Sequence, residues 1–93
     1  MRNILQGIVN YRANHNDAWP DTLDDIHEDL YSPLEELIEN PYTHDNPGYE
    51  YVKPRKDADP ATTAVLFQLR DGKQDLSLEA GYGDGRVLPY RAQ

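Results

Sequence analysis

Three carboxylates in predicted loops are candidate ligands for a metal ion. Asp57 and Asp59 lie in the mixed-charge stretch 55–60, and Asp84 lies in the glycine-rich run 81–85. Hard cations such as calcium take oxygen ligands, and carboxylates in loops around a sheet can supply them. The spacing of the three does not match an EF-hand, so solvated loop acids are the alternative interpretation. Asp57, Asp59 and Asp84 are therefore the candidate calcium ligands, and no other cofactor is expected.

The three histidines are the other side chains that commonly bind metals. His15, His27 and His44 are separated by 12 and 17 residues, so they form no i, i+4 pair that would place two imidazoles on one helix face. All three lie among polar residues. The sequence therefore predicts solvent-facing histidines rather than a zinc site.

Nucleophiles and paired acids and bases form no recognisable arrangement in the sequence. The chain has no cysteine, and no serine or threonine lies in a nucleophile elbow. The pairs Asp24-Asp25 and Glu35-Glu36 are adjacent in sequence, so their members point to different faces of a helix. The run 81–85 is followed by no Lys-Ser/Thr pair, which favours a hairpin turn over a phosphate loop or a calcium repeat. No catalytic residue is assigned, and the chain is expected not to be an enzyme.

The overall charge limits the class of partner. The 93 residues include 17 acidic and 9 basic ones, which gives a formal net charge of −8. Such a charge repels phosphate backbones, so nucleic acid and anionic membrane surfaces are not expected as partners. The segment 17–45 carries ten acidic residues and no Lys or Arg. A chain of this length forms one domain with a single small core, and no run reaches the ~18 apolar residues of a membrane span.

The first element that would position these side chains is a helix over residues 1–16. Its apolar residues recur at i, i+3, i+4 and i+7, the pattern of a helix with one buried face: Met1, Ile4, Leu5, Ile8 and Tyr11. The turn-favouring residues 14–17 end this helix. Trp19 is expected to anchor the core at the end of the buried face, and Pro20 prevents the helix from continuing.

Two short acidic helices are predicted within residues 21–40. Asp21 is expected to cap a helix over residues 22–30, which carries apolar residues at i, i+3 and i+7. A capping-box pattern begins at Ser32, and Pro33 takes the first helical position of the second helix. An Asn-Pro pair then ends the helical region.

Strand patterns fill the predicted sheet region, residues 49–91. Alternating or β-branched runs predict four strands, at residues 49–53, 62–69, 76–80 and 86–90. The second run is apolar on both faces and is expected to be an inner strand, whereas Pro89 places the last strand at an edge. Two Asp-Gly pairs predict hairpin turns with positive φ, the second at Asp84 and Gly85.

The order of these elements predicts one α+β domain over residues 1–93. A long N-terminal helix and short helices would pack on a three- to four-stranded antiparallel sheet. The buried face of the helix and Trp19 are expected to pack together against Val65, Phe67, Leu76 and Leu78.

Two passages of the chain match known sequence patterns. Residues 3–11 (NILQGIVNY) and 14–26 (NHNDAWPDTLDDI) are similar to the passage NLRQIGLAxxxYxxDxxGxYPxSLxxL, and residues 82–87 (YGDGRV) are similar to an FADGHV hairpin that closes an H-X9-DG domain. In both passages the chain resembles pseudopilin-like proteins, the prepilin-type proteins of type II secretion and their type IV pilus relatives. Gln74 and Arg86 stand where the family has histidines, so no role of those histidines carries over.

The resemblance implies an excised soluble head domain whose helix continues a membrane-embedded segment in the full-length protein; a helix that starts uncapped at Met1 agrees with this expectation. Such heads lie in the periplasm or on the extracytoplasmic face of the inner membrane. They act through contacts with other pilin-like subunits or secretion-system proteins and carry no catalytic residues. A small calcium-binding module is the alternative.

Overall fold

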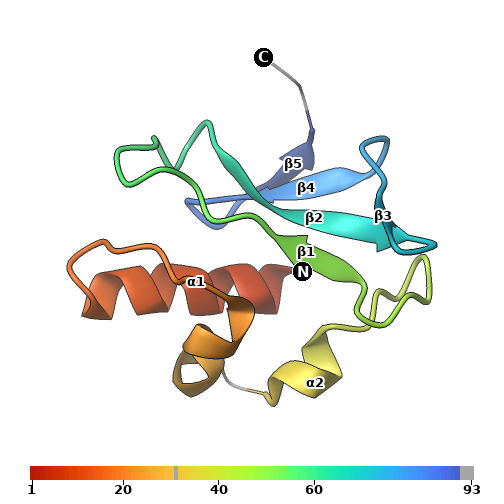
Figure 1. The fold of residues 1–93 in the computed structure, drawn as a ribbon, viewed down its shortest axis with the longest axis horizontal. Coiled ribbons are helices and arrows are strands. Elements are labelled where there is room, and N and C mark those ends of the chain that lie inside the picture. The colour runs from red at the N-terminus through yellow and green to blue at the C-terminus, as the bar shows by residue number, and fades with distance from the viewer. Residues whose placement is uncertain (31, 91–93) are drawn as a thin grey trace.

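The computed structural model describes residues 1–30 and 32–90, which fold as an N-terminal helix and a five-stranded antiparallel sheet (Figure 1). In chain order the elements are α1 (Arg2–Asn14), the 3-10 helix η1 (Leu23–Asp29), α2 (Leu34–Leu37), β1 (Tyr49–Tyr51), β2 (Ala64–Arg70), β3 (Lys73–Gln74), β4 (Glu79–Tyr82) and β5 (Val87–Pro89). The predicted α+β class is confirmed. Two predicted segments, 21–40 and 49–91, include positions 31 and 91, which lie outside the described residues.

α1 forms where the amphipathic pattern predicts it and ends at Asn14, the first of the turn-favouring residues 14–17 that are predicted to end it. The chain then turns through Asn16 and Asp17, whose φ angles of 53° and 64° are ones that Asn and Asp tolerate better than most residues. Three residues of the predicted buried face are at most 1% exposed: Ile4, Leu5 and Ile8. Met1 and Tyr11 are partly buried at its two ends.

Both short helices exist, but the predicted N-caps are wrong by one residue. η1 has Thr22 rather than Asp21 as its N-cap, because Thr22 is extended, with φ −141° and ψ 168°, and the helix begins at Leu23. The Asp25 carboxylate accepts hydrogen bonds from the backbone N–H groups of Thr22 and Asp21, at 3.1 and 3.0 Å. α2 has Pro33 rather than Ser32 as its N-cap, because a ψ of 140° keeps the proline extended. The acidic segment is therefore helical only in short turns.

The sheet has the strand order β1-β2-β4-β5, and β3 pairs with the end of β2. All pairings are antiparallel. β2 is the predicted inner strand, with residues 65–69 buried, and β5 is the predicted edge strand. The sheet has one strand more than predicted, because the Asp71-Gly72 turn, with φ angles of 53° and 77°, extends into the two-residue strand β3.

The predicted strand over residues 76–80 is wrong in its first half. The Asp75 carboxylate accepts a hydrogen bond from the backbone N–H of Ser77 at 3.0 Å, and the Leu78 N–H donates to the Asp75 carbonyl at 3.2 Å. This turn replaces sheet pairing until Glu79. Leu76 is consequently 51% exposed and Leu78 is half-buried, so neither is in the core.

Gly81 belongs to β4 and not to the turn predicted over residues 81–85. It pairs with Leu66 in the register of β2 and β4. A Cβ atom at this position would lie 2.6 Å from a methyl carbon of Leu5, so the missing side chain gives Leu5 of α1 room to pack on β4. The turn itself is shorter than predicted, and Gly85 has the expected positive φ, 95°.

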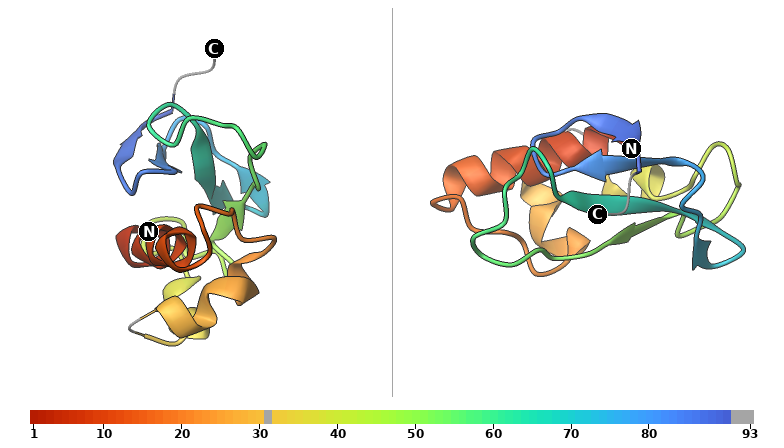
Figure 2. Two further views of the ribbon diagram at one scale, coloured as in Figure 1. Left: turned by 90° about the vertical axis from the view of Figure 1, so that its left-hand side faces the viewer. Right: turned by 90° about the horizontal axis from the view of Figure 1, so that it is seen from above.

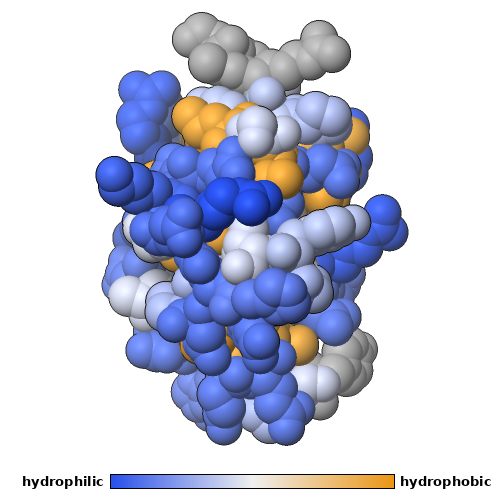
Figure 3. All heavy atoms as spheres, turned by 90° about the vertical axis from the view of Figure 1, so that its right-hand side faces the viewer, coloured by the Kyte–Doolittle hydropathy of each residue, from blue (hydrophilic) through white to orange (hydrophobic). Residues whose placement is uncertain are grey.

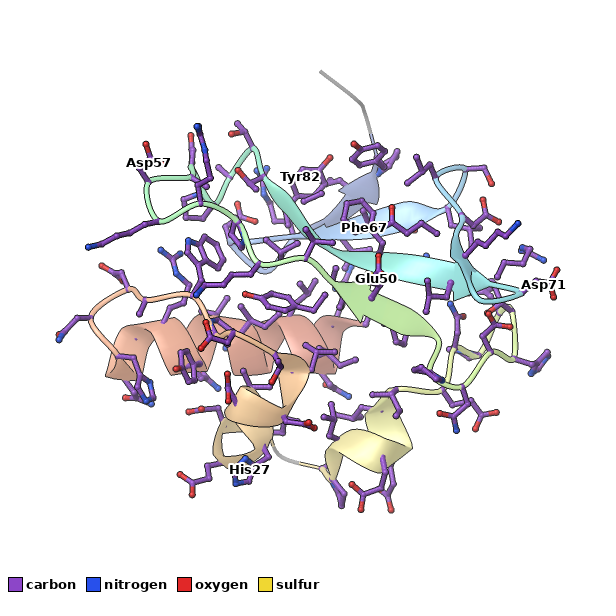
Figure 4. All side chains as sticks on the ribbon, in the orientation of Figure 1. His27, Glu50, Asp57, Phe67, Asp71 and Tyr82 are labelled. Atoms are coloured by element: carbon purple, nitrogen blue, oxygen red, sulfur yellow. The ribbon has the colours of Figure 1, made fainter. Side chains whose placement is uncertain are left out.

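The core lies between the sheet and the helices, and Figure 2 shows α1 between the sheet and the two short helices. Its buried residues are Ile4, Leu5, Ile8, Trp19, Ile26, Tyr49, Val65 and Leu66. The prediction that Phe67 packs against α1 is wrong. Phe67 is buried, but it projects to the side of the sheet opposite α1 (Figure 4) and packs edge-on against Tyr90, with ring centroids 5.3 Å apart.

The segment after α1 is part of this core. Trp19 is 5% exposed, and Pro20 is fully buried beside it in the sequence. The Tyr51 hydroxyl donates a hydrogen bond of 2.7 Å to the Pro20 carbonyl and so ties β1 to this segment. Trp19 and Pro20 therefore occupy the structural positions that the sequence predicts for them.

Candidate functional site

The loop of residues 40–48 is held by a network of hydrogen bonds that centres on a buried asparagine. Asn40 is completely buried, and its Nδ2 donates to the side-chain Oε1 of Gln68 at 3.0 Å and to the Gly48 carbonyl at 3.3 Å. Its Oδ1 accepts hydrogen bonds from the backbone N–H groups of Tyr42 and Thr43 at 2.8 and 3.3 Å. The Asn40 side chain therefore forms hydrogen bonds with backbone groups at both ends of the loop.

Further hydrogen bonds attach this loop to the sheet. The Thr43 hydroxyl donates to the Leu69 carbonyl at 2.7 Å, and the Asp45 carboxylate accepts from the Gly72 N–H at 2.9 Å. Gln68 in turn donates to a carbonyl of β4 at 2.9 Å. Buried polar networks in which each member has a partner hold a single conformation, so the loop has a defined shape.

The loop presents an aromatic side chain to solvent. Tyr42 is 79% exposed, more than any other large hydrophobic residue that the structure describes. Exposed tyrosines on rigid loops can bury much area in a partner with little loss of conformational entropy, and tyrosine is enriched at the energetic centres of protein interfaces. The arrangement can therefore support a protein contact. We call residues 40–48 the Asn40 loop.

Sequence reasoning did not find the Asn40 loop. It treated Asn40 only as a residue that ends a helix before a proline, and Gln68 only as part of an apolar strand. The available signal is the isolated amide Gln68 inside β2, because a buried side-chain amide requires hydrogen-bond partners. Which distant residue supplies them depends on the fold.

The structure does not gather the three predicted calcium ligands into one site. Within residues 1–30 and 32–90, no group of three or more His, Asp or Glu side chains could hold a metal ion. The Asp59 carboxylate accepts a hydrogen bond from the Ala61 N–H at 3.0 Å, and Asp57 lies 3.8 Å from the guanidinium of Arg55. Asp84 belongs to the turn before β5.

Arg86 forms an ion pair with Asp84 in the turn between β4 and β5. Its Nε donates to the Asp84 carboxylate at 2.7 Å, and the other carboxylate oxygen accepts from the Arg86 N–H at 3.1 Å. Its Nη2 also donates to the Ala61 carbonyl at 2.9 Å. The guanidinium therefore joins the β4–β5 turn to the loop that carries Asp59.

The three histidines are exposed and separate, as predicted. The Nδ1 atom of His15 lies 2.7 Å from the Tyr11 carbonyl, and the two rings stack with centroids 3.9 Å apart. The Nδ1 atom of His27 lies 2.8 Å from the Asp24 carbonyl. These contacts are local contacts within or beside helices.

Three side chains that have hydrogen-bond partners also have shifted pKa values. Burial, with a contribution from the Asp21 carboxylate, raises the pKa of Tyr51. The hydrogen bond and ion pair with Asp21 raise the pKa of Lys53. Hydrogen bonds from Ser77, followed by those from Arg70, lower the pKa of Asp75. The Tyr51 shift is therefore due mainly to burial, whereas the Lys53 and Asp75 shifts are due mainly to hydrogen bonds with neighbouring side chains.

Comparison with known proteins gave no match to a family model, to a curated protein or to a solved structure. None of the helices in the described part of the chain is both long enough and apolar enough for a membrane span.

Proposed function

We propose that this chain is the non-catalytic, extracytoplasmic head domain of a pseudopilin-like protein that acts through protein contacts in a type II secretion or pilus-like assembly. The observation that carries the proposal is the packing of the amphipathic helix α1 on an antiparallel sheet, together with the sequence resemblance. Other pilin-like subunits or secretion-system proteins are its partners. The full-length protein is anchored in the membrane by a segment outside this sequence.

The two faces of α1 support this proposal. Ile4, Leu5 and Ile8 are buried against the sheet, whereas Arg2, Asn3 and Gln6 are exposed. The sheet covers α1 on one side and the short helices cover it on another, and the remaining exposed strip is available to neighbouring subunits. Subunits that stack helix on helix need such a face.

The Asn40 loop supports a second contact, made by the head. Figure 3 views the molecule from the side on which β3 and this loop lie, and the surface there is mostly hydrophilic with scattered hydrophobic residues. A contact on a polar surface such as this one would be of the kind that forms and dissociates, because permanent interfaces are more hydrophobic. Tyr42 is the residue that such a contact would bury.

The N-terminus of the native protein tests the family assignment. Mass spectrometry of the protein isolated from its own cells should find an N-terminal segment of ~20 apolar residues before position 1, preceded in the gene by a prepilin-type cleavage site. A native protein that starts at Met1 contradicts the filament proposal. The measurement does not depend on any loop contact.

Substitution of Tyr42 tests the contact in the full-length protein. Tyr42→Ser should reduce assembly or partner binding at least ~10-fold, because interface tyrosines often contribute more than 1.4 kcal/mol. Leu76→Ser is the matched control, since Leu76 is also a large exposed residue, at 51%, but lies outside the Asn40 loop. Equal effects of the two substitutions would contradict a role of the loop.

A further inference from the structure

A pocket of about 450 Å³ lies between the segment that follows α1 and the loop that joins β1 to β2. Three of its seven lining residues are cations, Arg12, Lys53 and Lys56. Figure 4 shows nitrogen-tipped side chains on this side of the molecule, between the end of α1 and the loop that carries Asp57. One third of the chain's nine basic residues thus line a single pocket in a protein of net charge −8.

Arg12 is held in place at the wall of this pocket. Its Nε and Nη2 atoms both donate to the Asp17 carbonyl at 3.1 Å, and its guanidinium carbon lies 3.8 Å from the centroid of the Trp19 ring. The Nη1 atom makes no hydrogen bond to the described residues. A guanidinium fixed by stacking and by two hydrogen bonds loses little entropy when it binds a further acceptor.

The two lysines differ in whether they form an ion pair. Lys53 forms an ion pair with Asp21. Lys56 forms no ion pair or side-chain hydrogen bond within residues 1–30 and 32–90, and the lining residues include a single carboxylate, that of Asp17. The pocket therefore combines a rigid guanidinium with an uncommitted ammonium.

We propose that this pocket binds a carboxylate-bearing anion, with Arg12 Nη1 and Lys56 Nζ as the donors. The Nε and Nη2 atoms of Arg12 are bonded to the Asp17 carbonyl, so Nη1 and the Lys56 ammonium on the same pocket are the donors left for a carboxylate, and the volume of about 450 Å³ leaves room for the body of an organic acid. Two sources can supply this group, a free organic acid or an acidic side chain from segment 17–45 of a second copy of the chain. Neither source requires the proposed membrane-anchored assembly.

Trp19 makes the proposal directly testable, since it is the chain's single tryptophan and Arg12 stacks on its ring. Citrate is titrated at constant ionic strength against sodium chloride while tryptophan fluorescence is recorded. A free organic acid predicts a saturable change, with Kd raised at least ~10-fold by Lys56→Gln because a charge-assisted hydrogen bond is lost. The matched control Lys73→Gln removes an exposed lysine on β3 and should leave Kd unchanged.

The second arm examines binding between copies. Sedimentation velocity over a series of protein concentrations, without citrate, should show association that Lys56→Gln weakens and Lys73→Gln does not. Circular dichroism verifies that both variants are folded. The proposal is overturned if neither a saturable citrate response nor association occurs, or if Lys56→Gln has no greater effect than Lys73→Gln on the response that does occur.

Discussion

Asn40 shows at the scale of a single residue how one polar side chain determines the shape of a segment. A completely buried amide contacts both ends of its own loop and reaches Gln68 in the middle of the sheet. The cost of leaving any of these groups without a partner exceeds the net gain from forming one hydrogen bond. The stability of this region therefore depends on the completeness of the network.

Asn40→Ala should lower the free energy of unfolding by about 2–3 kcal/mol, because it leaves the Gln68 Oε1 atom and the backbone groups that Asn40 contacts without that hydrogen-bond partner. Urea denaturation measures this loss. Asn14→Ala provides the control, since Asn14 is exposed at the end of α1 and should change stability by less than ~0.5 kcal/mol. Similar values for the two variants would show that the network contributes little.

Tyr51 should make the free energy of unfolding decrease at alkaline pH. Its pKa is raised in the folded state, mainly by burial, so the protonated phenol is favoured by folding. The corresponding stability is fully present below the unfolded pKa of ~10 and is lost as pH rises above it. Stability measured by urea denaturation should therefore fall from pH 9 to pH 11, and Tyr51→Phe should show a smaller fall.

The same substitution has a separate effect at neutral pH. Tyr51→Phe removes the hydrogen bond to the Pro20 carbonyl and should cost about 1 kcal/mol at pH 7. The lower stability at pH 7 and the smaller alkaline fall are distinct results. A variant with an unchanged alkaline fall would contradict the assignment to Tyr51.

At the scale of elements, α1 is stabilised by packing rather than by its ends. Its N-cap makes no side-chain hydrogen bond and its first turn contains no acidic residue. A helix of 13 residues is marginal on its own in water. The burial of one face against the sheet and the short helices is therefore the main source of its stability.

Ile8→Ala should destabilise the protein by about 2–4 kcal/mol, because the side chain is completely buried and its removal leaves a cavity. Gln6→Ala lies on the exposed face of the same helix and should change stability by less than ~0.5 kcal/mol. Thermal or urea unfolding gives both values. An Ile8→Ala effect below ~1 kcal/mol would mean that α1 does not pack as described.

Two substitutions in the β4–β5 turn should show how much a backbone conformation and a charge each contribute to stability. Gly85 has a φ of 95°, so Gly85→Val should cost more than ~1 kcal/mol through backbone strain. Asp84→Asn weakens an ion pair with Arg86 that is largely exposed on the arginine side, and should cost less than ~1 kcal/mol. Equal losses in urea denaturation would contradict this division.

At the scale of the whole molecule, the charge is distributed unevenly. The segment 17–45 contributes acidic side chains through the loops and short helices, whereas Arg12, Lys53 and Lys56 line one pocket. The net charge of −8 favours solubility and opposes compaction through self-repulsion. Added cations therefore act on the molecule even where they occupy no site, and a test for a specific ion needs a matched salt.

Calcium at millimolar concentration should raise the thermal midpoint no more than sodium chloride does at the same ionic strength. The Asp84 carboxylate is already paired with Arg86, and Asp57 and Asp59 are not grouped with it. A specifically bound ion would add RT ln(1 + [L]/Kd) to stability. A larger midpoint in calcium that Asp84→Asn removes would establish the calcium-binding alternative.

The local pattern of the sequence determined the elements that depend on nearby residues. The 3.6-residue periodicity predicted α1 and its buried face, and the apolar run predicted the inner strand. The two Asp-Gly pairs predicted turns, with positive φ at Asp71, Gly72 and Gly85 but not at Asp84. These features follow from interactions over a few residues, so the sequence alone carries them. The position of Pro89 at an edge follows from its missing N–H in the same way.

Tertiary structure decided the features that depend on distant residues. Leu76 and Leu78 alternate like a strand, but the Asp75 turn removes them from the sheet, and Gly81 enters β4 because Leu5 packs over it. Phe67 belongs to the face of the sheet that is turned away from α1. The partners of Asn40 and the cations of the pocket are likewise brought together from separate segments. Local pattern cannot specify such contacts, because which residues meet depends on how all the elements pack at once.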